Sequence, residues 1–356
     1  MKLSSFLIAA SFFASSYSSY AQSFNKGENP TTQIEAAVIN GDYGTVTSIL
    51  ILEDGSPVYE GYFNGSDEST LHNTRSVTKT ITGMMVGAAV ADGVLALDDP
   101  AARFFPELAP FSSPDPRKLT ITIEDLLTMS SPLECDDWNQ FSRGNEERMY
   151  IVEDWNRFFW DLPIRGFPAW ATPPEKSAYG RAFSYCTAGV QTLGEIVERA
   201  SGRSITEYAS EKLLSPLNIT AFEWAKTGSG RVHLGGGFLL TTKGLGKFAE
   251  LQRHNGSHKE DVIFTADWAE KSTTPHAAIP DTPFQYGYLW WLMPYEVEGE
   301  PHVAAAMTGN GGNRVFVLPD HKLSVVFTNT DFNTSQMHQN AQKFFEAEIV
   351  SRLSAR

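Results

Sequence analysis

The sequence predicts a mixed α/β (α+β) fold in which helices flank an antiparallel sheet and a helical lobe is inserted into it. Three observations support this prediction. Strand-like segments occur near both ends of the chain, helices joined by proline- and tryptophan-rich loops fill the middle, and 356 residues exceed one usual hydrophobic core. We therefore expect an α/β domain of residues 22–105 plus 232–356, a helical lobe of residues 106–231, and a binding cleft between them.

The first elements are a hairpin and a buried helix. Residues 45–52 and 58–63 are rich in β-branched and aromatic residues, and the turn-forming residues 53–56 join them. Residues 76–91 follow as a run that is apolar on nearly all sides and contains glycines and alanines. Such a run predicts a buried, closely packed helix.

The later elements return to the sheet. Between residues 100 and 231 the periodicity favours helices, and after residue 285 it favours strands. The predicted helices are residues 123–129, 188–200 and 205–214, the predicted strands are residues 286–291, 314–318 and 323–327, and Glu346 lies in a predicted final helix.

The N-terminus predicts an export signal. Lys2 precedes an apolar stretch over residues 6–14, and Ser19 and Ala21 place small residues where a signal peptidase cuts. A membrane anchor is the alternative, but the stretch is shorter than the ~20 residues that span a bilayer. We therefore expect residues 1–21 to be a signal peptide and the mature protein to be periplasmic or secreted, without a stable membrane anchor.

Charge and cysteine content narrow the partners. The 28 basic and 42 acidic residues give a net charge of −14 without a basic cluster, so nucleic acid is not an expected partner. The expected partner is a small-molecule substrate, and the oligomeric state is left open.

Cys135 and Cys186 are expected to form a disulfide in an oxidising compartment, with two buried free thiols as the alternative.

The most informative motif is Ser76-Val77-Thr78-Lys79, at the start of the predicted buried helix. If Ser76 opens the helix, Lys79 lies one turn later on the same face, so its amine reaches the serine hydroxyl. A neutral amine can accept the proton of a serine nucleophile, and burial, Arg75 and the positive helix end all favour the neutral amine. The motif alone is weak, because residues 23–26 have the same spacing.

Two further segments carry candidate groups. Tyr185 lies in a polar loop before a predicted helix, where its phenol could share a proton with Lys79 and pass it to a leaving group. Residues 308–313 form a glycine-rich stretch before a strand, and backbone N–H groups at such an edge can stabilise an oxyanion. The alternatives are an interfacial tyrosine and a simple hairpin turn.

In their order, these motifs resemble those of the serine β-lactamase and penicillin-binding-protein superfamily, on the class C-like side that includes esterases and 6-aminohexanoate-dimer hydrolases. The resemblance extends from about residue 48 to residue 327 and implies a β-lactamase/transpeptidase-like fold. Ser76-Val77-Thr78-Lys79 resembles the S-x-x-K motif, Tyr185-Cys186-Thr187 the Y-x-N or Y-x-S motif, Asn310-Gly311-Gly312 the K-T-G or H-x-G motif, and residues 123–133 and 235–242 two flanking segments.

The resemblance also implies roles for these residues. Ser76 would be the acylated nucleophile, with Lys79 and Tyr185 as general bases. The oxyanion hole would consist of the backbone N–H groups of Ser76 and Asn313. The substrate-binding positions would be Thr187, Asn310, Gly311 and Gly312.

Two positions depart from the family pattern. Thr187 replaces an amide that contacts the acylamide side chain of β-lactams, and Asn310 replaces a lysine or histidine that would meet a substrate carboxylate. Losing that cation should cost on the order of 1.5–3 kcal/mol for an anionic substrate, so efficient β-lactam hydrolysis is not expected. Arg314 and Arg181 are the candidate substitutes.

The remaining polar and aromatic residues have simpler interpretations. No close metal-ligand spacing is present among the histidines, so neither a metal ion nor a cofactor is expected. We expect Asp136 and Asp137 to be loop or surface residues. Four tryptophans are expected to pack the helical lobe or, alternatively, to line an apolar acyl pocket; they are Trp138, Trp155, Trp160 and Trp170.

The sequence thus predicts an exported, metal-independent serine hydrolase that cleaves an ester or small amide through an acyl-enzyme. Two alternatives stay open. One is a β-lactamase or a D-amino-acid peptidase acting on peptidoglycan peptides. The other is a binding or sensing protein that keeps the scaffold but does not turn over.

Overall fold

The first and last parts of the chain meet in one large sheet. The computed structural model describes residues 30–354, so the predicted signal peptide lies outside the described residues. Eight antiparallel strands follow the order β2-β1-β13-β12-β11-β10-β9-β8. In the pair that joins the two ends of the chain, Ile49 of β1 lies opposite Phe327 of β13. This pairing explains why strand patterns occur at both ends of the sequence, and it confirms the predicted fold class.

The strands are β1 (Val46–Glu53), β2 (Ser56–Tyr62), β3 (His72–Asn73), β4 (Phe222–Trp224), β5 (Phe238–Leu240), β6 (Ser257–His258), β7 (Asp261–Val262), β8 (Ala277–Ala278), β9 (Gln285–Tyr286), β10 (Trp291–Val297), β11 (Glu300–Gly309), β12 (Asn313–Leu318) and β13 (Leu323–Asn329). The α-helices are α1 (Pro30–Ile39), α2 (Val77–Ala91), α3 (Ile123–Leu127), α4 (Glu146–Met149), α5 (Trp155–Asp161), α6 (Thr187–Ser201), α7 (Ile205–Ala209), α8 (Thr242–Arg253), α9 (Ala266–Ser272), α10 (Met337–Phe344) and α11 (Ser351–Ser354). Short 3-10 turns are η1 (Ala101–Phe104), η2 (Pro106–Leu108), η3 (Pro116–Thr120), η4 (Pro174–Lys176) and η6 (Pro319–His321), and π-helical turns are η5 (Ser210–Leu214) and η7 (Phe345–Val350).

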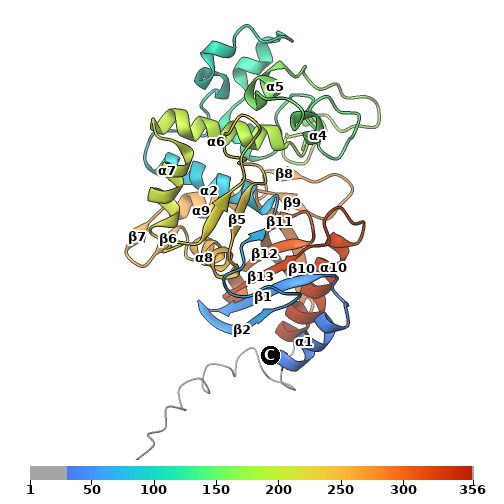
Figure 1. Ribbon diagram of the computed structural model, residues 1–356. Coiled ribbons are helices and arrows are strands. Elements are labelled where there is room, and N and C mark those ends of the chain that lie inside the picture. Colours follow the sequence, from blue (N-terminus) through green and yellow to red (C-terminus); the bar gives the residue numbers. More distant parts are fainter. Residues whose placement is uncertain (1–29, 355–356) are drawn as a thin grey trace, which may run out of the picture.

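The sheet separates two layers of core. Along β12, Val315 and Val317 join the apolar cluster on the α2 and α8 side, whereas Phe316 and Leu318 join the cluster formed with α1 and α10. This alternation is the period-2 pattern of a strand that is buried on both faces. Figure 1 shows the helix-rich part, with α4, α5 and α6, standing above the sheet and its covering helices.

Three elements differ from the sequence-based expectation. Residues 286–291 do not form one strand, because a turn with a positive φ of 60° at Leu289 separates β9 from β10. The N–H of Leu289 donates to Leu127, so a tertiary contact outweighs the local strand propensity. The strand β11 lacked a sequence signal, since its centre is the run Ala304-Ala305-Ala306. The short strand β4 lies inside the segment expected to be all-helical.

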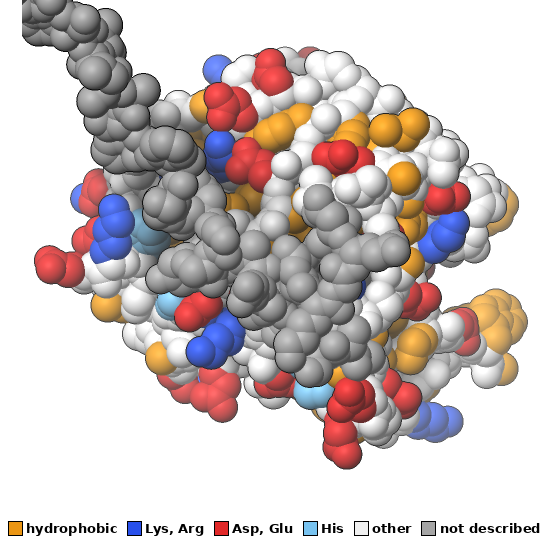
Figure 2. Space-filling view, turned by 90° about the horizontal axis from the view of Figure 1, so that it is seen from below, with side chains coloured by type: hydrophobic (Ala, Val, Ile, Leu, Met, Phe, Trp, Pro, Cys, Tyr) orange, Lys and Arg blue, Asp and Glu red, His pale blue; other side chains and the backbone are white. Residues whose placement is uncertain are grey.

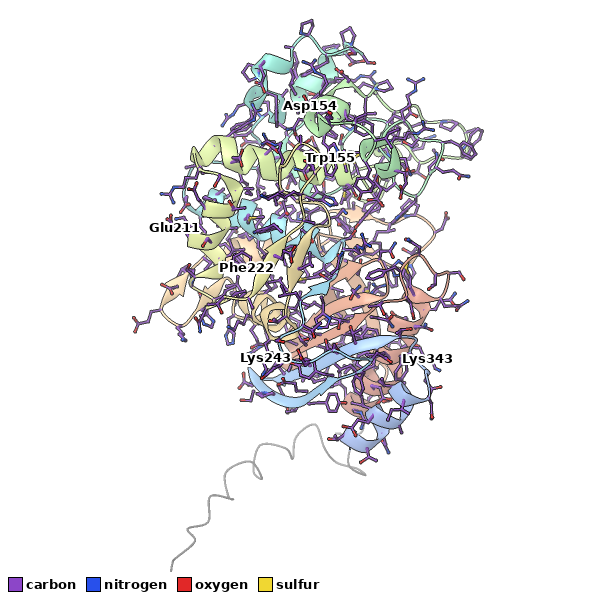
Figure 3. All side chains as sticks on the ribbon, viewed as in Figure 1. Asp154, Trp155, Glu211, Phe222, Lys243 and Lys343 are labelled. Carbon is purple, nitrogen blue, oxygen red and sulfur yellow. A yellow bond between two sulfur atoms is a disulfide. The ribbon has the colours of Figure 1, made fainter. Side chains whose placement is uncertain are left out.

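Where Figure 2 shows described side chains, the basic ones are scattered singly among acidic ones. Figure 3 places Lys243 and Lys343 on the sheet side of the molecule and Asp154 and Trp155 in the helix-rich part. Within residues 30–354, no helix has the length and apolar character needed to cross a bilayer.

Candidate active site

The helix α2 brings Ser76 and Lys79 together. Ser76 is the N-cap residue of α2, and Lys79 lies one turn into the helix, as the spacing predicts. The Lys79 Nζ atom donates hydrogen bonds to Ser76 Oγ at 3.0 Å and to the carbonyl oxygen of Gly235 at 2.6 Å. A side chain at position 235 would lie 2.5 Å from a Thr187 methyl carbon, so only glycine allows this close approach.

The Lys79 amine is almost completely buried, with 2% of the residue exposed. Burial lowers the pKa of Lys79, whereas the carboxyl groups of Glu146 and Asp137 act to raise it. Desolvation is the largest of these effects, so the site favours the neutral amine that a general base requires.

Threonines fix the position of α2. Three threonine hydroxyls of this helix make hydrogen bonds to neighbouring backbone groups rather than to the helix itself. Thr78 accepts from the N–H of Phe238, Thr80 donates to the carbonyl of Leu289, and Thr82 donates to the carbonyl of Leu234. These bonds lock the helix that carries Ser76 and Lys79 to the surrounding segments.

Tyr185 lies beside the same pair, in the loop that precedes α6. The Lys79 Nζ atom is 5.1 Å from the centre of the Tyr185 ring. Burial raises the pKa of Tyr185, and a hydrogen bond with the Ser76 side chain partly offsets this rise. The structure thus brings Ser76, Lys79 and Tyr185 into one cluster although Tyr185 is more than a hundred residues away in sequence.

A disulfide holds the Tyr185 loop. Cys135 and Cys186 are bonded, with their Cα atoms 5.4 Å apart, so the alternative of two free thiols does not apply. Next to this bond, the N–H of Asp137 donates to the carbonyl of Tyr185 at 2.9 Å. The loop at residues 135–137 therefore lies directly against the loop that carries Tyr185.

Asp137 lies in a loop and is partly exposed, as expected of a loop or surface residue, but its carboxyl group points inward. Its Oδ2 atom accepts hydrogen bonds from the N–H of Thr187 at 2.7 Å and from the Thr187 hydroxyl at 2.8 Å. Its Oδ1 atom is buried without a hydrogen-bond partner among the described residues. Burial, followed by the nearby Glu146, raises the pKa of Asp137 to about 7. The disulfide accounts for this orientation, because it draws this acidic loop inward.

The Thr187 hydroxyl has internal partners instead of facing a cleft. Thr187 is fully buried, and its Oγ1 atom lies 2.8 Å from Asp137 Oδ2 and 3.0 Å from Glu146 Oε2. These contacts commit the hydroxyl to the two carboxyl groups, so the structure does not present it as the substrate contact that the resemblance implies.

The glycine-rich segment forms the turn between β11 and β12. Asn310 exchanges hydrogen bonds with Asn333, and Gly311 and Gly312 adopt positive φ angles of 89° and 90° that favour glycine. The side chain of Asn313, at the start of β12, donates to the carbonyl of Asn310 and accepts from the N–H of Asn329.

Gly309, at the end of β11, packs against the segment that leads to Ser76. A Cβ atom added to Gly309 would lie 1.9 Å from the carbonyl oxygen of Thr74, two residues before Ser76. The sequence analysis includes Gly309 in the glycine-rich stretch of residues 308–313 but assigns it no separate role; a glycine at a strand end is a signal for close backbone approach.

The two candidate replacement cations have different surroundings. Arg181 forms ion pairs with Glu124 at 2.5 Å and Asp125 at 2.6 Å. Arg314 is buried, donates to the carbonyl of Asn313 at 2.9 Å, and lies close enough to Tyr185 to influence its pKa. Burial lowers the pKa of Arg314 to about 10. Arg314 is therefore the cation that the structure places near the cluster.

Aromatic side chains form one wall of the cluster. Trp138 stacks on Tyr185 with ring centres 5.5 Å apart and an angle of 8°, and 55% of Trp138 is exposed. Trp291 lies 6.0 Å from Tyr185 and 6.1 Å from Trp138. Trp155 and Trp160 are buried as expected of packing residues, whereas Trp170 is exposed.

A second aromatic contact lies on the helix-rich side of the site. Trp155, labelled in Figure 3, packs edge-on against His233 at 5.1 Å, two residues before the Gly235 carbonyl that Lys79 binds. Burial, aided by the charges of Lys79 and Arg75, lowers the pKa of His233 to about 3, so this ring is neutral at physiological pH. No group of His, Cys, Asp and Glu suited to a metal ion occurs in the described part of the chain.

Comparison with known proteins identifies the family. A family model described as β-lactamase matches residues 39–347, and the chain belongs to this family. Esterase EstB of Burkholderia gladioli is 34% identical over 155 residues, which are 43% of this chain and 38% of EstB. Lovastatin esterase of Penicillium rubens is 28% identical over 164 residues, 41% of this chain and 37% of that protein. The chain thus spans about two fifths of the length of these curated relatives.

Solved structures agree on the fold. A protein from Bacillus anthracis assigned as a 6-aminohexanoate-dimer hydrolase superposes with a TM-score of 0.71 at 18% identity, covering 90% of this chain and 82% of that one. A family VIII carboxylesterase superposes with a TM-score of 0.64 at 16% identity, covering 88% and 97%. The predicted resemblance to the β-lactamase and penicillin-binding-protein superfamily is therefore confirmed.

Proposed function

We propose that this protein is a serine hydrolase that cleaves esters through an acyl-enzyme on Ser76. The observation that carries the proposal is the 3.0 Å contact between Ser76 Oγ and a buried Lys79 amine whose pKa is lowered. A serine hydroxyl becomes a competent nucleophile when a neighbouring base can take its proton. Family membership and the two esterases among its relatives support the same chemistry.

The proposed reaction has two halves. Ser76 Oγ attacks the ester carbonyl while its proton moves to the Lys79 amine, and the tetrahedral intermediate then collapses to the acyl-enzyme. The leaving alkoxide receives the proton from Lys79 by way of the Tyr185 phenol. In the second half, water gives a proton to Lys79 as it attacks the carbonyl carbon of the acyl-enzyme. The tetrahedral intermediate then collapses, the bond to Ser76 Oγ breaks, and Ser76 Oγ takes this proton back from Lys79, which releases the acid and regenerates both groups.

The proposed substrates are uncharged esters with an apolar group, ahead of β-lactams. Asn310 stands where the family has a cation, and Arg181 is held in two ion pairs. Arg314 is near the cluster, but it is buried and donates to the carbonyl of Asn313. An exposed Trp138 beside Tyr185 instead offers an aromatic surface to the acyl or alcohol part. Small amides are the second proposed class of substrate, after esters.

Labelling of the purified protein with a fluorophosphonate, followed by peptide mass spectrometry, tests the proposal. We expect one adduct on Ser76 and none on the Ser76→Ala variant. A panel of p-nitrophenyl esters, short amides and nitrocefin then ranks the substrates. Absence of an adduct on the wild-type protein would refute the hydrolase, and nitrocefin turnover that is lost in Lys79→Ala would favour a β-lactamase.

We also propose that the protein is exported. The proposal rests on the signal-like sequence of residues 1–21 and on the Cys135–Cys186 disulfide, because disulfides persist in oxidising compartments. Fractionation of cells that produce the full chain tests it: the mature protein should appear outside the cytoplasm and lack its first 21 residues.

A further inference from the structure

The carboxyl groups of Asp137 and Glu146 lie on either side of the Thr187 hydroxyl, near Lys79. The single hydroxyl of Thr187 lies 2.8 Å from Asp137 Oδ2 and 3.0 Å from Glu146 Oε2. A hydroxyl has one proton, so it can donate to only one of two ionised carboxylates, and the other contact would bring lone pairs together. If one carboxyl keeps its proton, it donates to Thr187, and Thr187 donates to the other carboxyl. Both contacts then become hydrogen bonds.

Burial strengthens this argument. Thr187 is fully buried, and Asp137 Oδ1 is buried without a hydrogen-bond partner among residues 30–354. An ionised carboxylate oxygen in such a place is costly, whereas the oxygen of a neutral carboxyl is much less so. The pKa of Asp137 is raised to about 7, by burial first and by the charge of Glu146 second.

The same two carboxyl groups act on the base of the proposed reaction. Their charges are the influences that raise the pKa of Lys79 against the effect of burial. A second negative charge on the pair therefore keeps Lys79 protonated, and a proton held by the pair releases the amine to act as a base.

The other titratable groups around the cluster stay in one state near neutral pH. Burial raises the pKa of Tyr185 and of Tyr150, whose hydroxyl donates to Glu146 at 3.2 Å. His233 remains neutral because its pKa is lowered to about 3. The carboxyl pair is thus the group whose charge changes there.

We propose that Asp137 and Glu146 share one proton through the Thr187 hydroxyl and act as positioning residues that set the charge of Lys79. The inference rests on the proposed function, since it assigns to these residues the control of the base that accepts the proton of Ser76. The proposed reaction gives neither carboxyl group a contact with the substrate. The disulfide beside Asp137 keeps the pair in register with the loop of Tyr185.

The test is the rate of fluorophosphonate labelling of Ser76 measured from pH 5 to 10. In Asp137→Asn or Glu146→Gln the pair can carry at most one negative charge instead of two. We therefore expect the midpoint of the labelling profile to move to lower pH by at least about half a unit in each variant. Glu147→Gln is the matched control, because Glu147 is an exposed neighbour on the same helix, α4, and its profile should equal that of the wild type.

A second measurement reports the proton directly. The infrared spectrum of the wild type near pH 6 should contain the band of a protonated carboxyl that is lost both in Asp137→Asn and in Glu146→Gln, and kept in Glu147→Gln. This readout on the wild type stands even where a variant folds poorly. Unchanged labelling midpoints in folded variants, or no protonated-carboxyl band near pH 6, would overturn the inference. A wild type that is not labelled at all would instead refute the proposed function, while the infrared band would still report the shared proton.

Discussion

The Lys79 amine is held in surroundings that pull its charge in two directions. Removal from water favours the neutral form, and the carboxyl groups of Asp137 and Glu146 favour the ammonium form. A base that must accept a proton and return it within one cycle benefits from such a balance, because both protonation states are then accessible near the working pH.

Replacing Lys79 should abolish the nucleophilicity of Ser76. We expect both Lys79→Ala and Lys79→Arg to slow fluorophosphonate labelling by at least about 100-fold, since arginine keeps the positive charge but cannot release its proton. Lys118 is the matched control, because it is also fully buried but binds the carbonyl of Trp160 instead. Lys118→Met should lower stability and leave the labelling rate of the folded protein unchanged. An active Lys79→Arg would contradict a role of Lys79 as base.

Gly309 should be sensitive to substitution although it has no side chain. A methyl group at this position would lie 1.9 Å from the Thr74 carbonyl, so either the end of β11 or the segment before Ser76 must move. We expect Gly309→Ala to lower the labelling rate at least about 10-fold, because displacements near 1 Å cost that much or more. Gly166→Ala, where an added Cβ meets no atom within 4 Å, should have no effect. Equal rates in the two variants would exclude the close approach.

The aromatic side chains beside Tyr185 should influence which substrates the enzyme prefers. Trp138 is stacked on Tyr185 yet more than half exposed, so it can contact a substrate bound at Ser76. We expect Trp138→Ala to raise the KM for apolar esters about 2- to 10-fold with a smaller change for p-nitrophenyl acetate. Trp170→Ala is the control, as Trp170 is 88% exposed and outside this wall. Equal effects of both substitutions would argue against an aromatic subsite.

At the scale of elements, the disulfide joins two loops that local structure alone would leave independent. Cys135 and Cys186 are 51 residues apart, and the bond brings Asp137 against Tyr185 and the start of α6. Loop-closure entropy alone assigns such a crosslink about 4 kcal/mol of stability.

Removing the bond should therefore affect stability and catalysis together. We expect the Cys135→Ser/Cys186→Ser double variant to lose about 2–4 kcal/mol of unfolding free energy in urea. Its labelling rate at 25 °C should also fall, because Tyr185 and Asp137 lose their common support. A variant that is less stable but labelled at the wild-type rate would limit the disulfide to a structural role.

Elements with strong periodic patterns were predictable, and those decided by partners were not. The helix α2 and the strands β1, β12 and β13 have clear apolar patterns, and the structure contains them within one or two residues of the expected limits. The sequence does not predict β11, because alanine has a low strand propensity. Its place between β10 and β12 comes from strand pairing alone.

The site shows the same division between local and long-range information. The spacing within Ser76–Lys79 indicated their contact, because one helical turn determines it. The positions of Asp137 and Gly309 depend on a disulfide and on the register of a ladder, neither of which is visible in a local pattern. For this reason the sequence indicates a loop or surface position for Asp137 but not that its carboxyl group points inward, and it does not indicate the contact between Gly309 and Thr74.

For the whole molecule, a buried histidine ties stability to pH. His72 is 6% exposed and lies between the hydroxyls of Thr47 at 3.3 Å and Thr242 at 3.0 Å, where β1 and α8 pack together. Burial lowers its pKa to about 4 from the usual 6.5. The unfolded chain then binds a proton below pH 6.5 that the folded protein does not bind until about pH 4, so stability falls as the pH drops through this window.

The expected loss can be isolated by comparing two proteins. Between pH 7.5 and pH 5, His72 should lower the unfolding free energy of the wild type by about 2 kcal/mol, since each pH unit below the unfolded pKa contributes about 1.4 kcal/mol. Asp137 acts in the opposite sense, because its raised pKa makes the folded state gain stability as the pH falls below about 7.

The difference in pH dependence between the wild type and His72→Gln removes the contribution of Asp137, because Asp137 is present in both proteins. Urea unfolding at both pH values should show the flatter response in His72→Gln, whereas His254→Gln, at a more exposed histidine, should follow the wild type. A wild type and a His72→Gln variant with parallel pH responses would show that His72 is protonated equally in the folded and unfolded states.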